Sequence, residues 1–212
     1  MRTPHRDQCR PAILALCIAV IFLSIPASAA FAAEYTVLPN GSAYLAEIQV
    51  NDSAGYTFAE SGVLGERVPI KVSNVTLSND TCVACNFTKK SDSEITYQKG
   101  NYSISYMGPI KDNHLVGTYD KIYNITVNLP SNFSVSNPLL AGLSQGSAVT
   151  NNPDNSTRIQ WNNTKSFDLR FYDENRESLL YLFGNFWIII AVIFLLPFVL
   201  TWKRKPPEIG GK

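Results

Sequence analysis

The chain has 212 residues and a formal net charge of +1, and only 17% of its residues are charged. An apolar content of 45% excludes a disordered tail or a collagen-like fibre, and the near-neutral sum disfavours a nucleic-acid binder with a strongly basic surface. The sum hides three segments: the first ten residues carry +2, residues 34–178 carry −4 from 15 acidic and 11 basic residues, and residues 203–212 carry +3. The charge pattern therefore indicates an acidic central region with basic segments at both ends of the chain.

Residues 1–32 have the three parts of a secretory signal peptide. Basic residues at the start precede an uncharged apolar run at 12–25, and small residues fill 27–33. The 14 residues of the run would extend about 21 Å as a helix, which is short of the ~30 Å hydrocarbon core of a bilayer. We therefore expect a cleaved signal peptide rather than a retained anchor. A-x-A sites end at Ala29 and at Ala32, and the sequence leaves the choice between them open.

The region 34–178 has the pattern of a β domain. Short apolar or alternating runs are separated by turn-forming pairs such as Asn40-Gly41, and none has helical periodicity. The predicted strands are 43–50, 67–77, 94–98, 102–106, 123–129, 158–162 and 167–172. We expect 94–106 to form a hairpin with its turn at Lys99-Gly100. The number and spacing of the strands predict an antiparallel β-sandwich of the immunoglobulin-like class.

Ten asparagines of this region stand in N-x-[ST] sequences in which x is not proline. They are Asn40, Asn51, Asn74, Asn79, Asn86, Asn101, Asn124, Asn132, Asn155 and Asn162. Polar side chains on the wet face of strands would explain the alternation around many of them. That explanation does not account for the choice of asparagine, which strands disfavour. We therefore expect several of these sequons to carry N-linked glycans.

Two cysteines remain once the signal peptide is removed, Cys82 and Cys85. Outside the cell a disulfide is their expected state, and with this spacing the bridge would pin a loop rather than cross-link the domain. Two alternatives stay open. A thioredoxin-type redox pair would need a helix start within a βαβ pattern, and a zinc site would need two chains that each contribute both thiolates.

The sequence offers little for catalysis. His114 is the one histidine of the region 34–178, and no G-x-S-x-G elbow accompanies it. The acidic residues Asp173, Glu174 and Glu177 lie just before the second apolar segment, where solvation of the chain explains them better than acid–base chemistry. We expect no enzymatic activity, no cofactor, no metal and no nucleic-acid partner.

The second apolar segment, 179–202, has 24 residues without a charge, which is long enough to span a bilayer as a helix. Aromatic residues crowd both of its ends, as at a membrane interface. Lys203, Arg204 and Lys205 follow directly, and the positive-inside rule assigns this end to the cytoplasm. We therefore expect a transmembrane helix at 179–202, a cytoplasmic tail at 203–212 and a β domain outside the cell.

Five short motifs follow one another in the C-terminal half of the chain. They are Asn137-Pro138-Leu139-Leu140, the segment 142–146, Arg158-Ile159-Gln160-Trp161, Asp168-Leu169-Arg170-Phe171-Tyr172 and Leu180-Tyr181-Leu182-Phe183-Gly184. By these motifs the chain resembles, over 101–202, a domain-of-unknown-function family of euryarchaeal single-pass membrane proteins. The resemblance implies a β-rich exported domain, a C-terminal span and an archaeal cell surface, and it supplies no catalytic residue. Members often begin with a lipoprotein cysteine, whereas this chain has an A-x-A region, so their N-terminal anchoring is not carried over.

The predicted function is that of a membrane-anchored, N-glycosylated cell-surface protein with a non-catalytic binding or structural role in the envelope. Its expected partners are the lipid bilayer and proteins of the envelope or of a membrane complex. One alternative is an extracellular metal-binding or redox module that uses Cys82 and Cys85. Another is an accessory subunit of a membrane complex, which Gly184 and Asn185 in the outer part of the span would favour.

Overall fold

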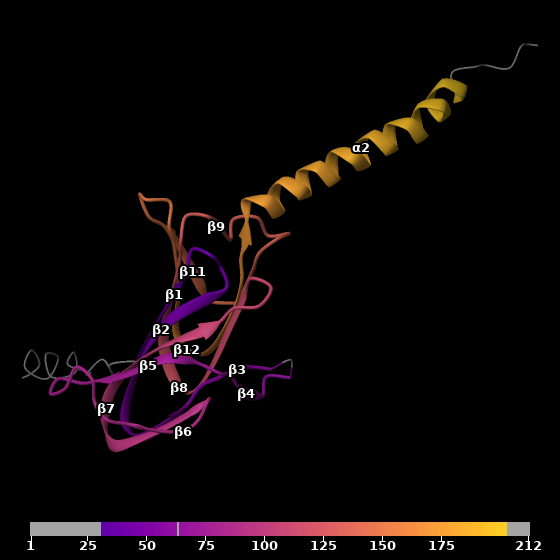
Figure 1. The fold of residues 1–212 in the computed structure, drawn as a ribbon. Helices are drawn as coiled ribbons and strands as arrows, with labels where there is room; N and C mark the ends of the chain where they lie inside the picture. Colours follow the sequence, from indigo (N-terminus) through magenta and orange to yellow (C-terminus); the bar gives the residue numbers. More distant parts are fainter. Residues whose placement is uncertain (1–30, 63, 203–212) are drawn as a thin grey trace, which may run out of the picture. The chain divides into compact units, whose positions relative to one another are not determined.

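The computed structural model describes residues 31–62 and 64–202. The predicted signal peptide lies outside these residues apart from Phe31 and Ala32, and the predicted tail 203–212 lies outside them as well. The described strands are β1 (Phe31–Val37), β2 (Ala43–Thr57), β3 (Ala59–Ser61), β4 (Arg67–Pro69), β5 (Ser73–Ser78), β6 (Thr88–Ser91), β7 (Glu94–Pro109), β8 (His114–Leu129), β9 (Phe133–Ser134), β10 (Gly142–Leu143), β11 (Ser147–Asn151), β12 (Thr157–Arg170) and β13 (Tyr172–Asp173), and helix α2 spans Glu174–Trp202 (Figure 1). The prediction of a mainly β region followed by one long C-terminal helix is confirmed.

Nine of the described strands form one sheet in the order β10-β12-β8-β1-β2-β7-β5, with β11 added to β12 and β6 added to β7. Strand β1 lies near the centre, antiparallel to β2 and parallel to β8. Purely antiparallel pairing was therefore the wrong expectation at the β1–β8 ladder. A parallel pair needs a long crossover connection, and the strands between β1 and β8 provide it. The structure shows one large mixed sheet and does not show the two separate sheets of an immunoglobulin-like sandwich.

Four long strands, β2, β7, β8 and β12, bend in the middle of their length. Their ladders shift register after Val50 in β2 and after Trp161 in β12, and bulges of this kind bend a strand. We call residues 51–54, 97–101, 119–122 and 162–165 the bend. Across it, the ring of Tyr35 in β1 lies 5.1 Å from that of Phe167 in β12. The two halves of the bent sheet therefore share one core.

The predicted hairpin at 94–106 is wrong. Strand β7 continues through Lys99 and Gly100, and Gly100 pairs with Ser53 of β2. The glycine marks a bulge rather than a tight turn. The two strands predicted within β12 are likewise one strand that crosses the bend. A bulge interrupts the alternation of side chains, so one bent strand has the sequence pattern of two short ones.

Strand β1 alternates between core and solvent along its whole length. Ala33, Tyr35 and Val37 are 1–3% exposed, whereas Ala32 and the other intervening residues face outward. This period of two is the pattern of a strand with one buried face. Strand β1 is thus part of the core rather than an appendage to it, and the sequence patterns do not predict it.

Helix α2 follows β13 without an intervening loop (Figure 1). Asp173 caps it, since its Oδ1 accepts a hydrogen bond from the backbone N–H of Arg176 at 3.0 Å. The helix therefore begins at Glu174, earlier than the predicted start at Leu179. Between Glu174 and Leu200 it is long and apolar enough to cross a membrane, with a mean hydropathy of 2.5. The most apolar stretch of the helix is not buried against the rest of the protein.

The ends of several strands gather where α2 begins. Strand β13 pairs with β9, and the N–H of Phe171 donates to the carbonyl of Asn113 at 3.1 Å. The Nδ2 of Asn132 donates to the carbonyl of Pro39 at 2.7 Å. These contacts bring the turn after β1, the turn before β8 and the segment before α2 to one end of the domain, which we call the helix end. The first residue of β1, Phe31, lies at the other end of its strand, beside the bend.

Candidate functional site

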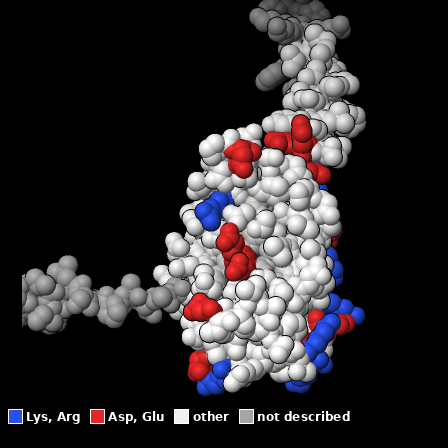
Figure 2. Space-filling model, turned by 60° about the vertical axis from the view of Figure 1, so that its left-hand side comes forward, with Lys and Arg blue, Asp and Glu red and all other residues white. Residues whose placement is uncertain are grey.

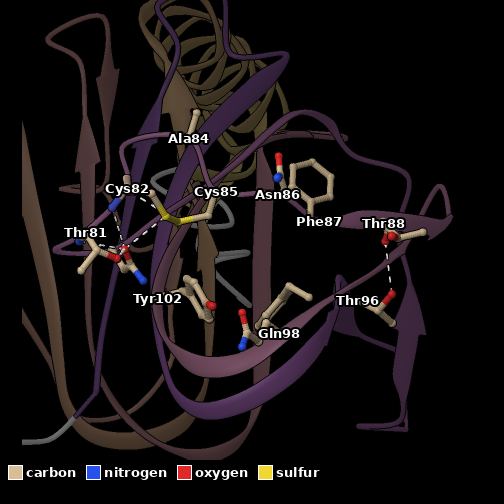
Figure 3. A pocket seen from close by; sticks show the side chains of 12 residues that line it. Thr81, Cys82, Ala84, Cys85, Asn86, Phe87, Thr88, Thr96, Gln98 and Tyr102 are labelled. Atoms are coloured by element: carbon tan, nitrogen blue, oxygen red, sulfur yellow. Dashed lines mark hydrogen bonds between the residues drawn. A yellow bond between two sulfur atoms is a disulfide. The ribbon is translucent and has the colours of Figure 1, made fainter.

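A hollow of about 700 Å³ opens beside the loop that joins β5 to β6 (Figure 3). In this loop Cys82 and Cys85 form a disulfide, with their Cα atoms 5.4 Å apart. Strand β7 contributes Gln98 and Tyr102 to the wall. None of the lining residues is charged, so the hollow presents amides, hydroxyls and aromatic rings.

The shape of this loop depends on Asn79. Its Oδ1 accepts hydrogen bonds from the backbone N–H groups of Thr81 and Cys82 at 2.9 and 2.8 Å, an Asx turn that asparagine readily forms. The hydroxyl of Thr81 donates to the same oxygen at 2.8 Å, and the N–H of Cys85 donates to the carbonyl of Leu77 at 2.6 Å. The disulfide and these hydrogen bonds together hold the loop at the edge of the sheet.

The hollow has the chemistry of a site for neutral ligands. Metal binding needs several convergent ligands, and within the described ranges 31–62 and 64–202 no three His, Cys, Asp or Glu side chains come together. Hydroxyl, amide and ring groups instead suit an uncharged polar molecule. Asn79 and Asn86, two of the sequon asparagines, belong to the lining, so a glycan on either would lie beside the hollow.

His114 pairs with Asp168 across β8 and β12. The Nε2–Oδ1 distance is 2.8 Å, and both residues line a second hollow, of about 950 Å³. A serine nucleophile would have to hydrogen-bond to the imidazole. The Oγ of Ser144 instead accepts the backbone N–H of Asp168 at 3.1 Å, and in the described part of the chain no serine hydroxyl is bonded to His114. The arrangement supports a cross-strand pair, not a triad.

A cluster of buried tyrosines occupies the core around the bend, and nothing in the sequence patterns singles it out. The hydroxyls of Tyr35 and Tyr119 hydrogen-bond to each other, and that of Tyr123 donates to the carbonyl of Gln49 at 3.0 Å. Burial raises the pKa of Tyr35 and Tyr119 well above the ordinary value, because a phenolate would be poorly solvated there. Burial likewise raises the pKa of Tyr44 to about 12. These residues are therefore neutral hydrogen-bonding groups of the core at physiological pH.

The sequon asparagines lie at the surface. Asn79 is half-buried. The exposed ones are Asn40, Asn51, Asn74, Asn86, Asn101, Asn124, Asn132, Asn155 and Asn162. The face in Figure 2 is mostly uncharged, with acidic and basic side chains in small separate groups. Exposure makes the side-chain amides accessible to attachment of a glycan, and glycosylation itself stays a prediction.

Four of these asparagines come from the four long strands, at or next to the bend. They are Asn51 in β2, Asn101 in β7, Asn124 in β8 and Asn162 in β12. The Oδ1 of Asn101 accepts the N–H of Asp52 at 2.9 Å, and that of Asn124 accepts the N–H of Asn163 at 3.0 Å. Both donor residues have positive φ angles, 53° and 54°. Asparagine at these positions therefore also satisfies backbone groups that the bulges free from the ladder.

The described residues define a class of protein: a mainly β domain with a disulfide-pinned edge loop, followed by a helix with the length and composition of a membrane span. The chain belongs to the DUF5803 family, a family of unknown function, whose model matches residues 30–204. No curated protein matches the chain. Membership of a family of unknown function confirms that part of the resemblance, and the match reaches further toward the N-terminus than residue 101. The predicted topology residues Lys203, Arg204 and Lys205 lie outside the described residues.

Proposed function

We propose that this protein is an N-glycosylated cell-surface protein, anchored in the membrane by α2, with a non-catalytic binding or structural role in the envelope. The observation that carries the proposal is the joining of two features in one chain. Helix α2 is apolar and unburied over Glu174–Leu200, and the β domain that precedes it bears ten sequons, nine of them with an exposed asparagine.

The proposed topology is a single pass with the β domain outside and the tail in the cytoplasm. It is supported by the three basic residues Lys203, Arg204 and Lys205 directly after the span, against acidic Glu174 and Glu177 before it. An archaeal cell membrane is the proposed location, since the family that the chain resembles is euryarchaeal. The bilayer is then the partner of α2, and envelope or membrane-complex proteins are partners of the domain.

We assign binding to the hollow beside the Cys82–Cys85 loop. Its lining is neutral and polar, with the ring of Tyr102 and the amide of Gln98 on the β7 side. Such a surface recognises uncharged polar groups by hydrogen bonds and ring contacts rather than by charge. The ligand class proposed is therefore a neutral polar segment of another envelope molecule.

Glycosylation is tested by the intact mass of the full chain purified from its native membranes. We expect a mass above that of the polypeptide. The Asn124→Gln variant should lose the mass of one glycan, whereas Asn128→Gln should lose none, because Asn128 is not in a sequon. A wild-type mass equal to the bare polypeptide would overturn this part of the proposal.

Topology is tested by adding protease to intact cells that carry the chain with a C-terminal tag. The proposal expects digestion of the β domain and survival of a fragment that contains α2 and the tag. Rupture of the cells should then expose the tag. Loss of the tag from intact cells with an undigested domain would show the opposite orientation.

A further inference from the structure

The first residues of β1 hold a structural position that bears on how the chain is processed. Phe31 and Ala32 pair with Tyr123 and Asn124 of β8. The Phe31 ring lies 5.3 Å from that of Tyr123, and the Nζ of Lys121 lies 4.9 Å from the centre of the same ring. The strand is therefore already formed and packed at Phe31.

We propose that the exported chain is cut between Ala29 and Ala30, so that Ala30 is the first residue of the mature protein. The step is hydrolysis of one peptide bond by a membrane peptidase that reads small residues at A-x-A sites. The C–N bond between Ala29 and Ala30 breaks. The hydroxyl of the attacking water forms the new carboxylate of Ala29, and the proton goes to the new amine of Ala30, which is protonated at neutral pH. The inference rests on the proposed export of the β domain, and it decides between the two A-x-A sites.

A cut after Ala32 conflicts with the core. It would place the new ammonium group on Ala33, whose exposed fraction in the uncut chain is 1% and which is paired with Ile48 on one side and Ile125 on the other. An unpaired charge is strongly disfavoured in such a place. The same cut would also remove the contacts of Phe31. A cut after Ala29 leaves every described residue of β1 intact and puts the charge ahead of Phe31.

The region that the family model matches begins at residue 30, so it includes every described residue of β1.

The test is the N-terminus of the full chain, purified from membranes through a C-terminal tag and read by mass spectrometry of its first peptide. We expect the chain to begin at Ala30. A chain that begins at Ala33 would overturn the proposal and leave export intact. A chain that begins at Met1 with its domain digested by external protease would overturn cleavage alone. Met1 together with a protected domain would overturn the proposed function itself.

Two matched variants sharpen the result. Ala29→Glu removes the small residue at the proposed site, and Ala32→Glu removes it at the other site on a side chain that faces outward in β1. We expect Ala32→Glu to begin at Ala30 like the wild type, and Ala29→Glu to lose that N-terminus and keep its leader. Conversion of Ala29→Glu to a chain that begins at Ala33 with an unchanged melting temperature would refute the argument from the buried amine.

Discussion

Strand β1 and the Cys82–Cys85 loop are held in the domain by opposite means. Strand β1 contains no cysteine and so has no disulfide. It lies between two strands and buries every second side chain. The loop lies at the edge of the sheet beyond β5, where Val83 is 90% exposed, and a disulfide with the hydrogen bonds of Asn79 holds it. Side-chain burial therefore stabilises the central strand β1, whereas the disulfide and local hydrogen bonds stabilise the loop at the edge of the sheet. Changes in β1 should therefore affect the whole domain, and changes in the loop should affect mainly the loop.

The largest effect is expected for Tyr35→Ala in β1. The Tyr35 ring contacts those of Tyr44 at 5.4 Å and Phe167 at 5.1 Å, so its removal leaves a cavity between the two halves of the sheet. We expect a loss of about 3–5 kcal/mol in the free energy of unfolding, measured by urea denaturation of the purified full chain in detergent. Val83→Ala is the control for the loop and should change the free energy of unfolding by less than about 0.5 kcal/mol. Equal losses of unfolding free energy in the two variants would show that β1 and the loop contribute equally to the stability of the domain.

Alkaline pH should destabilise the core around the buried tyrosines before it affects the Cys82–Cys85 loop. The folded pKa of Tyr44 is raised to about 12 by burial, while an unfolded tyrosine has a pKa of about 10. The folded state thus holds this proton more tightly, and its contribution of about 3 kcal/mol is complete below pH 10 and lost as the pH rises to about 12. Circular dichroism should show unfolding in that window. Tyr44→Phe has no phenol proton to lose at this position. Its free energy of unfolding should therefore fall less between pH 7 and pH 12 than that of the wild type. An equal fall in the two proteins would contradict this interpretation.

Loss of the disulfide should have a smaller effect. The ring between Cys82 and Cys85 is short, and the loop-entropy relation gives about 2 kcal/mol for four residues. We expect the Cys82→Ser/Cys85→Ser double variant to lose up to that amount of unfolding free energy and to retain the rest of the fold. Reductant should destabilise the wild type by the same amount and leave the double variant unaffected. Free thiols that resist labelling in the native protein would instead favour the metal-binding alternative.

The same contrast explains what the sequence predicts and what it does not. The alternating runs and the uncharged run at 179–202 are local patterns, and they predict a mainly β region and a long C-terminal helix, but not the limits of the individual strands. Strand β1 escapes prediction because Phe31 and Ala32 also satisfy the pattern of a signal-cleavage region. Its parallel pairing with β8 is a contact between residues far apart in the chain, which local periodicity cannot encode. The hollow beside the Cys82–Cys85 loop cannot be predicted from the sequence for the same reason. Cys82 is evident in the sequence, whereas the position of Tyr102 beside the loop depends on the register of β7.

The smallest effect is expected within the core, at the paired hydroxyls of Tyr35 and Tyr119. Tyr35→Phe leaves both rings in place and removes one buried hydrogen bond, so we expect a loss of about 1 kcal/mol. Tyr119→Phe should cost a similar amount. The double variant should cost less than the sum, because each single change leaves the other hydroxyl without its partner in the core. Additive losses in urea denaturation would show that the two hydroxyls contribute independently. The tyrosine cluster would then hold the two halves of the sheet together by ring packing alone.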